Sequence, residues 1–354
     1  MSLKDTLNSA HSHWMDAGGP ESDIVVSSRV RVARNLAGMP FPHLMSAEKA
    51  GEVIQAVKLA VEKADAGEIG GGLELMPLSE LSPLERQILV DKHLISPDHL
   101  LNNCQNKAVV LRDDEVVSIM VNEEDHLRIQ CLMPGLSLRE AWEVVNRVDD
   151  ALEKTLDYAF SEKIGYLTSC PTNTGTGMRA SVMVHLLGLK LTRQLGGVLG
   201  AIGKLGFTVR GLYGEGTEAL GDLFQVSNQI TLGQSEEEII DSLISVTVQI
   251  LSQERAARAA LYKNSPQLVE DRVFRAFGTL QNARILSSEE AMRLFSDLRL
   301  GIGLNIISGI SVRKLNELMV EIQPAFLMRL AGREMPAAER DVFRAALIRK
   351  ELGG

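Results

Sequence analysis

Cysteine is scarce in this sequence. The 354 residues include three cysteines, Cys104, Cys131 and Cys170, which are widely spaced and form no CxxC pair. An odd and dispersed set of this kind argues against a disulfide framework and against a structural zinc site. We therefore expect a reduced protein of the cytoplasm.

Long apolar runs and an excess of basic residues are also missing. No stretch approaches the roughly 20 apolar residues that a membrane-spanning helix requires, and residues 1–20 lack the basic-then-apolar pattern of a secretion signal. The formal net charge of −9 disfavours nonspecific binding to nucleic acid, which depends on a basic surface. We expect neither a membrane nor a nucleic acid as a direct partner.

The best-known nucleotide-binding motifs are absent as well. The nearest approach to a G-x-x-x-x-G-K-[ST] loop, residues 197–204, has one residue too many between its glycines, and Leu205 stands where the hydroxyl should be. The H-R-D and D-F-G triplets of protein kinases do not occur. If the chain binds a nucleotide, it must do so with a different arrangement of residues.

The pattern of apolar residues predicts an α+β protein with room for about two domains. We expect a mixed, largely antiparallel sheet flanked by helices, followed by an all-helical C-terminal domain. The expected domains are a flexible lead-in or short helix at 1–22, a catalytic domain at 23–258 and the helical domain at 259–354. Strands are expected near 23–32, 107–112, 115–122, 127–133, 164–169, 179–186, 207–211 and 223–230, and helices at 46–64, 82–94, 137–160, 189–204 and almost throughout from 235.

The most informative segment is residues 122–128, where Glu123, Glu124 and Asp125 stand between two apolar runs rich in β-branched residues. Both runs are typical of strands, so the acids lie at or near a turn. Crowded carboxylates repel one another, and a positively charged substrate would offset that repulsion. Taken alone, the segment is more simply interpreted as an ordinary solvated turn.

A set of arginines beside strands and glycine-rich turns forms a candidate anion site. Guanidinium groups bind phosphate oxygens in a bidentate manner and stay charged at all working pH values, and nearby glycines let the backbone approach a ligand. Any one of these arginines could be a surface residue or an ion-pair partner, but together they favour a phosphate site. The set is Arg29 and Arg31, which share one face of a strand by their spacing, with Arg128, Arg179 and Arg210, near Gly175, Gly177, Gly211 and Gly214.

Four segments resemble the motifs of the phosphagen (guanidino) kinase family, in that family's order: 28–35, 122–128, 170–180 and 210–215. The resemblance is closest to the bacterial branch that phosphorylates arginine residues of proteins, because the sequence lacks the N-terminal helical domain of creatine and arginine kinases and has a C-terminal helical domain instead. It implies the guanidino-kinase catalytic fold and transfer of the γ-phosphoryl group of ATP, bound with Mg²⁺, to protein arginines. Such marking serves regulation or Clp-type proteolysis.

Individual roles follow from the resemblance. An arginine side chain is a poor nucleophile with a pKa above about 12, so its phosphorylation requires carboxylates that orient it and accept a proton. Glu124 matches the catalytic carboxylate and Glu215 the second clamp on the guanidinium, while Glu123 and Asp125 would support the turn. The catalytic set is completed by Cys170, assigned to substrate positioning, and by Arg29, Arg31, Arg128, Arg179 and Arg210.

The ATP-binding residues implied by the same motifs include His93, which could equally be structural. No residue is assigned to a protein-bound metal. The implied ATP-binding set is Ser27, Ser28, Arg29, Val30, Arg31, His93, Arg128, Arg179, Ala180, Ser181, Val182, Met183, Arg210, Gly211, Leu212, Tyr213, Gly214 and Glu215.

A C-terminal hexapeptide is similar to the phosphoarginine-binding pocket of that bacterial branch. On spacing alone its two arginines would be an ordinary solvated charge pattern. The resemblance implies an allosteric pocket, and with it a zinc-finger activator, a heat-shock repressor and a Clp ATPase or protease as partners; the surrounding apolar helices suggest a homodimer. The residues are Arg340, Asp341, Val342, Phe343, Arg344 and Ala345.

Two other functions are weighed against this one. A small-molecule guanidino kinase is disfavoured because the missing N-terminal domain encloses small substrates in those enzymes. A phosphoarginine-binding adaptor or repressor regulator is disfavoured because Glu124, Glu215 and the five arginines are intact. One departure from the family, Leu187-Gly188 in place of a proline, lies beyond the nucleotide-binding run and is not expected to affect the chemistry.

Overall fold

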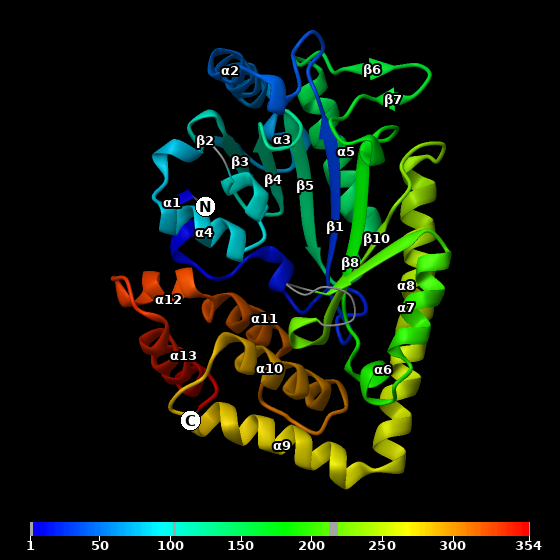
Figure 1. Ribbon diagram of the computed structural model, residues 1–354, viewed down its shortest axis with the longest axis vertical. Coiled ribbons are helices and arrows are strands. Elements are labelled where there is room, and N and C mark those ends of the chain that lie inside the picture. The colour runs from blue at the N-terminus through cyan, green and yellow to red at the C-terminus, as the bar shows by residue number, and fades with distance from the viewer. Residues whose placement is uncertain (1–2, 102–103, 212–218, 354) are drawn as a thin grey trace.

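The structure of this chain is a computed structural model that describes residues 3–101, 104–211 and 219–353. Its centre is an eight-stranded sheet in the order β2-β3-β4-β5-β1-β8-β10-β9, with helices packed against it (Figure 1). The strands are β1 Val25–Arg34, β2 Leu73–Pro77, β3 Ala108–Arg112, β4 Val117–Val121, β5 Leu127–Pro134, β8 Met178–His185, β9 Phe207–Gly211 and β10 Leu223–Asn228, with a separate hairpin of β6 Phe160–Ser161 and β7 Gly165–Tyr166.

Every strand pairing of this large sheet is antiparallel. The predicted α+β class is confirmed, but the word mixed is corrected, because the described strands include no parallel pair. For β3, β4 and β5 the reason is their connectivity, because these strands follow one another through short turns, and strands joined in this way pair antiparallel.

The helices begin largely where the capping signals predict. Ser82 and Glu85 form the expected capping box at the start of α4, and Ser235 and Glu238 form another at the start of α8. The α-helices are α1 Leu3–Asn8, α2 Ala47–Lys63, α3 Ala66–Ile69, α4 Pro83–Asp91, α5 Leu138–Glu153, α6 Leu187–Leu191, α7 Leu195–Lys204, α8 Glu236–Asn264, α9 Pro266–Asn282, α10 Ser288–Gly303, α11 Val312–Glu321, α12 Pro324–Ala331 and α13 Ala337–Glu351.

Three predicted elements differ in extent. The helix expected over 137–160 ends at Glu153, because the following backbone pairs with residues 35–37 instead: Ala37 N–H donates to Asp157 O and Ala159 N–H to Asn35 O. The helix expected over 189–204 is divided into α6 and α7 at Arg193, whose φ of +60° is left-handed. Of the strand expected over 164–169, only the two residues of β7 form.

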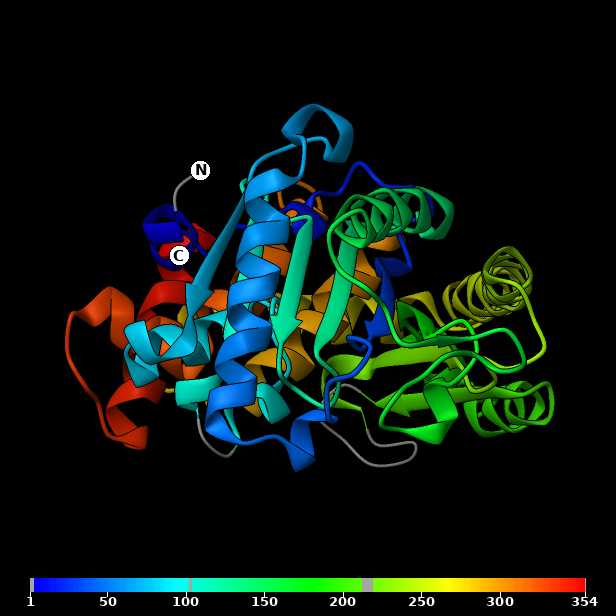
Figure 2. The same cartoon turned by 90° about the horizontal axis from the view of Figure 1, so that it is seen from above.

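The two faces of the sheet are covered differently. One face packs against α2, α5 and α8 in a continuous apolar core. The other face joins a second core with α4, the N-terminal segment and the C-terminal helices α9–α13. Helices α11–α13, orange to red, lie near α4, cyan, in both views (Figures 1 and 2). The C-terminal helices therefore share a core with the sheet, and α8 runs through the domain boundary expected near 258. Among the described helices, none combines the length and apolarity needed to cross a bilayer.

The N-terminal lead-in is built into this second core. Trp14 and Met15 are buried, and the buried Lys92, which directly follows α4, donates to the carbonyls of Thr6 and Ser9 and pairs with Glu115 at 2.8 Å. Burial lowers the pKa of Lys92, while Glu115 opposes that shift. The ion pair thus fastens residues 6–12 to the sheet.

Replacing Glu115 tests this attachment. Glu115→Gln is expected to lower the free energy of unfolding by about 3–5 kcal/mol, because it leaves the Lys92 charge buried without its partner. Urea denaturation measures the change. The matched control is Glu52→Gln, which breaks the half-exposed pair of Lys49 and Glu52 and is expected to leave the midpoint unchanged. Equal midpoints for both variants would contradict the assignment.

Candidate active site

The five predicted arginines lie on one face of the sheet, on strands β5, β1, β8 and β9. The register places them there: Arg31 on β1 is opposite Arg179 on β8, and Arg128 on β5 is opposite Ala33 on β1. Because side chains alternate between faces along a strand, Arg29 and Arg31 project to the same side. Period-two spacing therefore predicted the face correctly.

Strand β10 carries a polar residue that completes this arginine face. Gln225 lies opposite both Arg210 on β9 and Met183 on β8, and its Oε1 accepts a hydrogen bond of 2.6 Å from Arg29. The sequence reasoning missed Gln225. Its position in the alternating run Leu223-Gln225-Ser227 was the available signal, but that signal does not distinguish it from other polar strand residues.

The arginines repel one another in the absence of a ligand. Burial, with the charges of Arg128 and Arg179, lowers the pKa of Arg29 to about 10. Burial and the charges of Arg29, Arg128 and Arg179 lower the pKa of Arg31 well below its ordinary value, and the Nε of Arg31 is buried without a hydrogen-bond partner. A polyanion bound at this face would relieve both the repulsion and the missing hydrogen bond.

The acidic turn at 122–128 is fixed by its own side chains. Glu123 accepts a hydrogen bond from Ser96 and pairs with Arg128 at 2.5 Å. Asp125 is buried and accepts hydrogen bonds from Asn35 Nδ2 at 2.6 Å and from Ser169 N–H at 2.7 Å. Glu123 thus pairs with Arg128 and Asp125 orients the turn, in line with the supporting roles suggested by the sequence. The contacts made by Ser96 and Asn35 were not predicted.

Glu124 differs from Glu123 and Asp125 because, among the described residues, none donates a hydrogen bond to its carboxylate. Its side chain is 43% exposed, and its closest ion-pair contact is 3.6 Å from Arg128 Nη2. Partial burial raises the pKa of Glu124, as do Asp125, Glu123 and Asp98, against the opposing effect of Arg128. A carboxylate with a raised pKa at the edge of a cationic face is suited to receive a proton from a substrate.

Cys170 lies at the same edge. Its Sγ is 3.0 Å from Thr172 Oγ1, and both Cys170 and Glu124 are close enough to Arg179 to act on the pKa of that guanidinium, which burial and other arginines lower. Cys170 and Glu124 therefore each lie within electrostatic reach of Arg179. Cys131, by contrast, is buried in the sheet core, where burial raises the pKa of its thiol.

His93 lies beside the arginine face, at the end of α4. Its φ of +63° is left-handed, and its carbonyl accepts a hydrogen bond of 2.8 Å from Gln130 Nε2. Burial and the charge of Arg29 lower the pKa of His93 to about 4, so the ring is neutral at physiological pH. The ring is close to Arg29, and its centroid lies 5.6 Å from that of Trp14. This position is compatible both with ATP binding and with a structural role for His93.

Not all of the implied ATP-binding residues present their side chains to this face. Ser27, Ser181 and Met183 share the face of the arginines. The intervening residues point to the opposite face because of strand alternation, so only their backbone lies along the arginine face: Ser28, Val30, Ala180 and Val182. Gly211 ends β9, and the predicted Leu212, Tyr213, Gly214 and Glu215 lie outside the described residues.

The C-terminal hexapeptide begins in the first turn of α13. Arg344 is buried: its Nε donates to Ile322 O at 2.9 Å, its Nη1 to Leu286 O at 2.8 Å, and it pairs with Asp341 at 2.5 Å. Arg340 donates to Met335 O at 2.8 Å, and its Nε is buried without a hydrogen-bond partner. In this structure Arg344 therefore joins α13 to the ends of neighbouring segments, and Arg340 is the less committed of the two.

Solved guanidino kinases share this fold. The crystal structure of lombricine kinase superposes with a TM-score of 0.59, covering 73% of this chain and 76% of that chain at 23% identity. Its likeness agrees with the antiparallel sheet flanked by helices. The described residues contain no group of three or more His, Cys, Asp or Glu side chains placed to hold a metal ion.

Sequence comparisons are more specific. Residues 52–257 match the ATP:guanido phosphotransferase C-terminal catalytic domain, and residues 266–354 match the protein-arginine kinase McsB C-terminal domain. A protein-arginine kinase of Pelotomaculum thermopropionicum is 74% identical over 99% of both chains. A protein-arginine kinase of Desulforamulus reducens is 57% identical over 99% of this chain and 98% of the relative. The chain belongs to the ATP:guanido phosphotransferase family, in its protein-arginine kinase branch.

Proposed function

We propose that this chain transfers the γ-phosphoryl group of ATP to the guanidinium groups of arginine residues in proteins. The observation that carries the proposal is the juxtaposition of five mutually repelling arginines on one sheet face with the half-exposed and weakly paired carboxylate of Glu124 near its edge. The first element suits a triphosphate and the second a guanidinium. Membership of the protein-arginine kinase branch supports the choice of a protein acceptor over a free one.

In this mechanism the arginines bind the phosphates and offset the negative charge that moves onto ADP. An N–P bond forms between a guanidinium nitrogen and the γ-phosphorus as the bond to the bridging oxygen of ADP breaks, and the electron pair leaves with ADP. The proton released from the guanidinium nitrogen passes to Glu124 as the N–P bond forms. A carboxylate cannot deprotonate a free guanidinium to any extent, so the transfer has to accompany bond formation.

Other parts of the site act on orientation. Cys170 lies within electrostatic reach of Arg179 and is assigned to contact with the incoming arginine, and Glu215 is assigned as the second carboxylate of the clamp. Magnesium enters with the nucleotide, since it binds phosphate oxygens and water and needs few dedicated protein ligands. The arginine face fits a phosphate-bound metal complex because it supplies donors for the remaining phosphate oxygens.

The wider role follows the family resemblance. The catalytic part spans 23–258, and the helical part at 259–354 senses phosphoarginine through Arg340 and its neighbours and forms a homodimer. The partners are protein substrates with exposed arginines, a zinc-finger activator, a heat-shock repressor and a Clp ATPase or protease, all in the cytoplasm. The Arg340 Nε, which is buried without a hydrogen-bond partner, supports an anion site on α13, whereas Arg344, which bonds two carbonyls and Asp341, supports a structural role in that site.

The test is mass spectrometry, without exposure to acid, of a reaction containing Mg-ATP, the full chain, an unfolded test protein and free arginine. Phosphoryl groups on protein arginines are expected, both on the chain itself and on the test protein. Phosphate on free arginine alone would replace the proposal with a small-molecule guanidino kinase. If no transfer occurs even when a zinc-finger activator is added, the adaptor function replaces it.

A further inference from the structure

An open cavity of about 590 Å³ lies where the end of α5 meets the β6–β7 hairpin, at the end of the sheet that carries the acidic turn (Figure 1). The residues that define this aromatic pocket are Glu153, Lys154, Asp157, Tyr158, Phe160 and Tyr166. Aromatic residues make up only 4% of the chain, yet three of them line this pocket within residues 158–166. Phe160 is 57% exposed, and its ring meets that of Tyr166 edge-on with the centroids 5.1 Å apart. The pocket therefore presents an aromatic ring to solvent.

The charged side chains around this pocket leave it negative. Lys154 is compensated from α3, because it pairs with Glu68 at 2.6 Å. Glu153 and Asp157 are exposed, and neither forms an ion pair within the part of the chain that the structure describes. Burial and the charges of Asp149 and Asp150 raise the pKa of Glu153, against the opposing effect of Arg34. A cation bound in the pocket would relieve this repulsion.

A guanidinium already occupies the buried side of the same aromatic group. Arg34 ends β1 and, by strand alternation, faces α5 and not the arginine face. Its Cζ lies 3.4 Å from the ring centroid of Tyr166, and its Nη2 pairs with Asp149 at 2.6 Å. The exposed side offers the same two kinds of group to a cation from solvent: the Phe160 ring supplies a π face, and Glu153 and Asp157 supply carboxylates.

A short stretch of backbone joins the aromatic pocket to the candidate active site. Tyr166 N–H donates to Gly175 O at 2.8 Å, and Ser169 N–H donates to Asp125 in the acidic turn at 2.7 Å. Because Cys170 is only four positions after Tyr166, their Cα atoms are at most about 14 Å apart. An extended polypeptide whose acceptor arginine lies at the acidic turn can therefore place a side chain about four to six positions away in the pocket.

We propose that Phe160 and Tyr166, with Glu153 and Asp157, bind a second cationic side chain of the polypeptide substrate, a lysine or an arginine close in sequence to the arginine that is phosphorylated. The inference rests on the proposed function for the identity of the occupant as a substrate, whereas the binding of a cation does not depend on it. The pocket selects substrates by affinity. Its expected signature is a lower KM for polypeptides with a second basic residue, at unchanged kcat.

The binding step is tested without phosphoryl transfer, by saturation-transfer NMR on the full chain. The probe is a capped peptide that contains one lysine and no arginine. Saturation is expected to reach the methylene protons next to the lysine ammonium group. Phe160→Ala and Asp157→Asn are each expected to reduce this transfer roughly twofold or more, because one removes the π face and the other a carboxylate. Phe160→Tyr keeps an aromatic face and is expected to retain the transfer.

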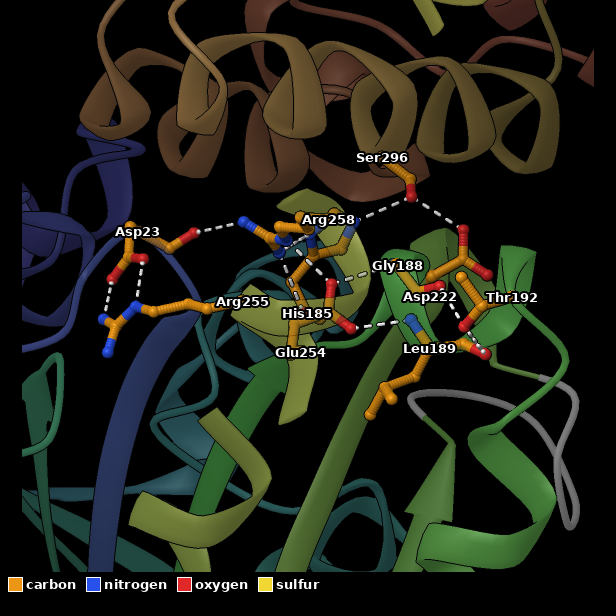
Figure 3. Close-up of polar contacts among 10 residues, drawn as sticks. All are labelled: Asp23, His185, Gly188, Leu189, Thr192, Asp222, Glu254, Arg255, Arg258 and Ser296. Atoms are coloured by element: carbon orange, nitrogen blue, oxygen red, sulfur yellow. Dashed lines mark hydrogen bonds and ion pairs between the residues drawn. The ribbon is translucent and has the colours of Figure 1, made fainter. Parts of the chain in front are cut away.

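The matched control is Asp23→Asn, which makes the same change in net charge away from the pocket. Asp23 precedes β1, so it lies at the opposite end of that ten-residue strand from Arg34. Its carboxylate pairs with Arg255 beside the polar network in which Arg258 contacts His185 and Ser296 donates to Asp222 (Figure 3). Asp23→Asn is expected to leave the transfer unchanged. An equal loss in Asp23→Asn and Asp157→Asn would show that the lysine responds only to net charge and would overturn the proposal.

The kinetic test uses two peptides, each with one arginine, that carry either lysine or methionine about five positions from it. For the wild type, KM is expected to be roughly 3- to 30-fold lower for the lysine peptide, the range that cation–π and ion-pair contacts support. In Phe160→Ala the two KM values are expected to converge, while kcat and KM for ATP stay within about twofold. Phe160 is exposed, and Asp157→Asn provides the same comparison if Phe160→Ala folds poorly.

Equal KM values for the two peptides in the wild type, or a preference for lysine that persists in both pocket variants, would overturn the proposal. If the wild type phosphorylates neither peptide, the proposed function fails. The NMR comparison then decides separately whether the pocket binds a cationic side chain.

Discussion

Glu124→Gln is expected to reduce kcat for arginine phosphorylation by about 10²–10⁴-fold, the range over which a positioned general base contributes. The amide keeps the size of the side chain but cannot take the proton that leaves the guanidinium as the N–P bond forms. Binding of ATP is expected to persist, because Glu124 makes only a 3.6 Å contact with Arg128 and the remaining arginines are untouched. Quantitative mass spectrometry of phosphoarginine, together with calorimetric titration of ATP, measures both effects.

The matched control for this variant is Asp98→Asn. Asp98 is exposed and lies close enough to Glu124 to raise its pKa, so its removal changes the local charge equally without removing the base. It is expected to leave kcat within about twofold of the wild type, as surface charges are weakly coupled through solvent. If both variants lose the same activity, the effect belongs to local charge and Glu124 is not the base.

Arg31→Met is expected to abolish catalysis while making the nucleotide-free protein more stable. Loss of an arginine that stabilises a transferring phosphoryl group costs about 10³–10⁵-fold in kcat. Removing the Arg31 charge also removes the free-energy cost of burying it and its repulsion by Arg29, Arg128 and Arg179. Replacing a poorly compensated buried charge with an apolar side chain is often stabilising. We expect Tm without nucleotide to rise by about 2–4 °C for each kcal/mol relieved.

Arg34→Met, three residues further along β1, is the opposing control. Arg34 is buried and donates to Asp149 through Nε at 2.9 Å and Nη2 at 2.6 Å. Its removal leaves Asp149 buried without its cation and is expected to cost about 3–5 kcal/mol of stability. Differential scanning calorimetry should therefore show a higher Tm for Arg31→Met and a lower Tm for Arg34→Met than for the wild type. A lower Tm for Arg31→Met would show that the arginine face is stabilising in the absence of phosphate.

Sequence reasoning was most successful where the determining interactions are local. The period-two spacing of Arg29 and Arg31, the capping box at Ser82 and the position of the acids between β4 and β5 each depend on a few consecutive residues. Such patterns persist whatever the rest of the chain does, because strand alternation and helix capping are properties of short backbone segments. They placed Arg29 and Arg31 on one face of a strand and the three acids at a turn.

Errors arose where a distant residue decided the outcome. The helix after Ser137 ends early because residues 157–159 find backbone partners at 35–37. The partners of the buried Arg344, which are the carbonyls of residues 286 and 322, were likewise not predicted. None of these partners can be identified from the pattern around the residue itself.

The sequence by itself was therefore sufficient to predict the class of fold, the chemistry of the site and its catalytic side chains. These predictions depend on local periodicity and on the family motifs. The tertiary structure decided which contacts tune those side chains. Gln225, which binds Arg29, is 196 residues away from it, and Ser296, which holds Asp222, is 74 residues away. Packing brings such pairs together only after the whole sheet and the C-terminal helices have formed, because each hydrogen bond requires two surfaces that the chain builds separately.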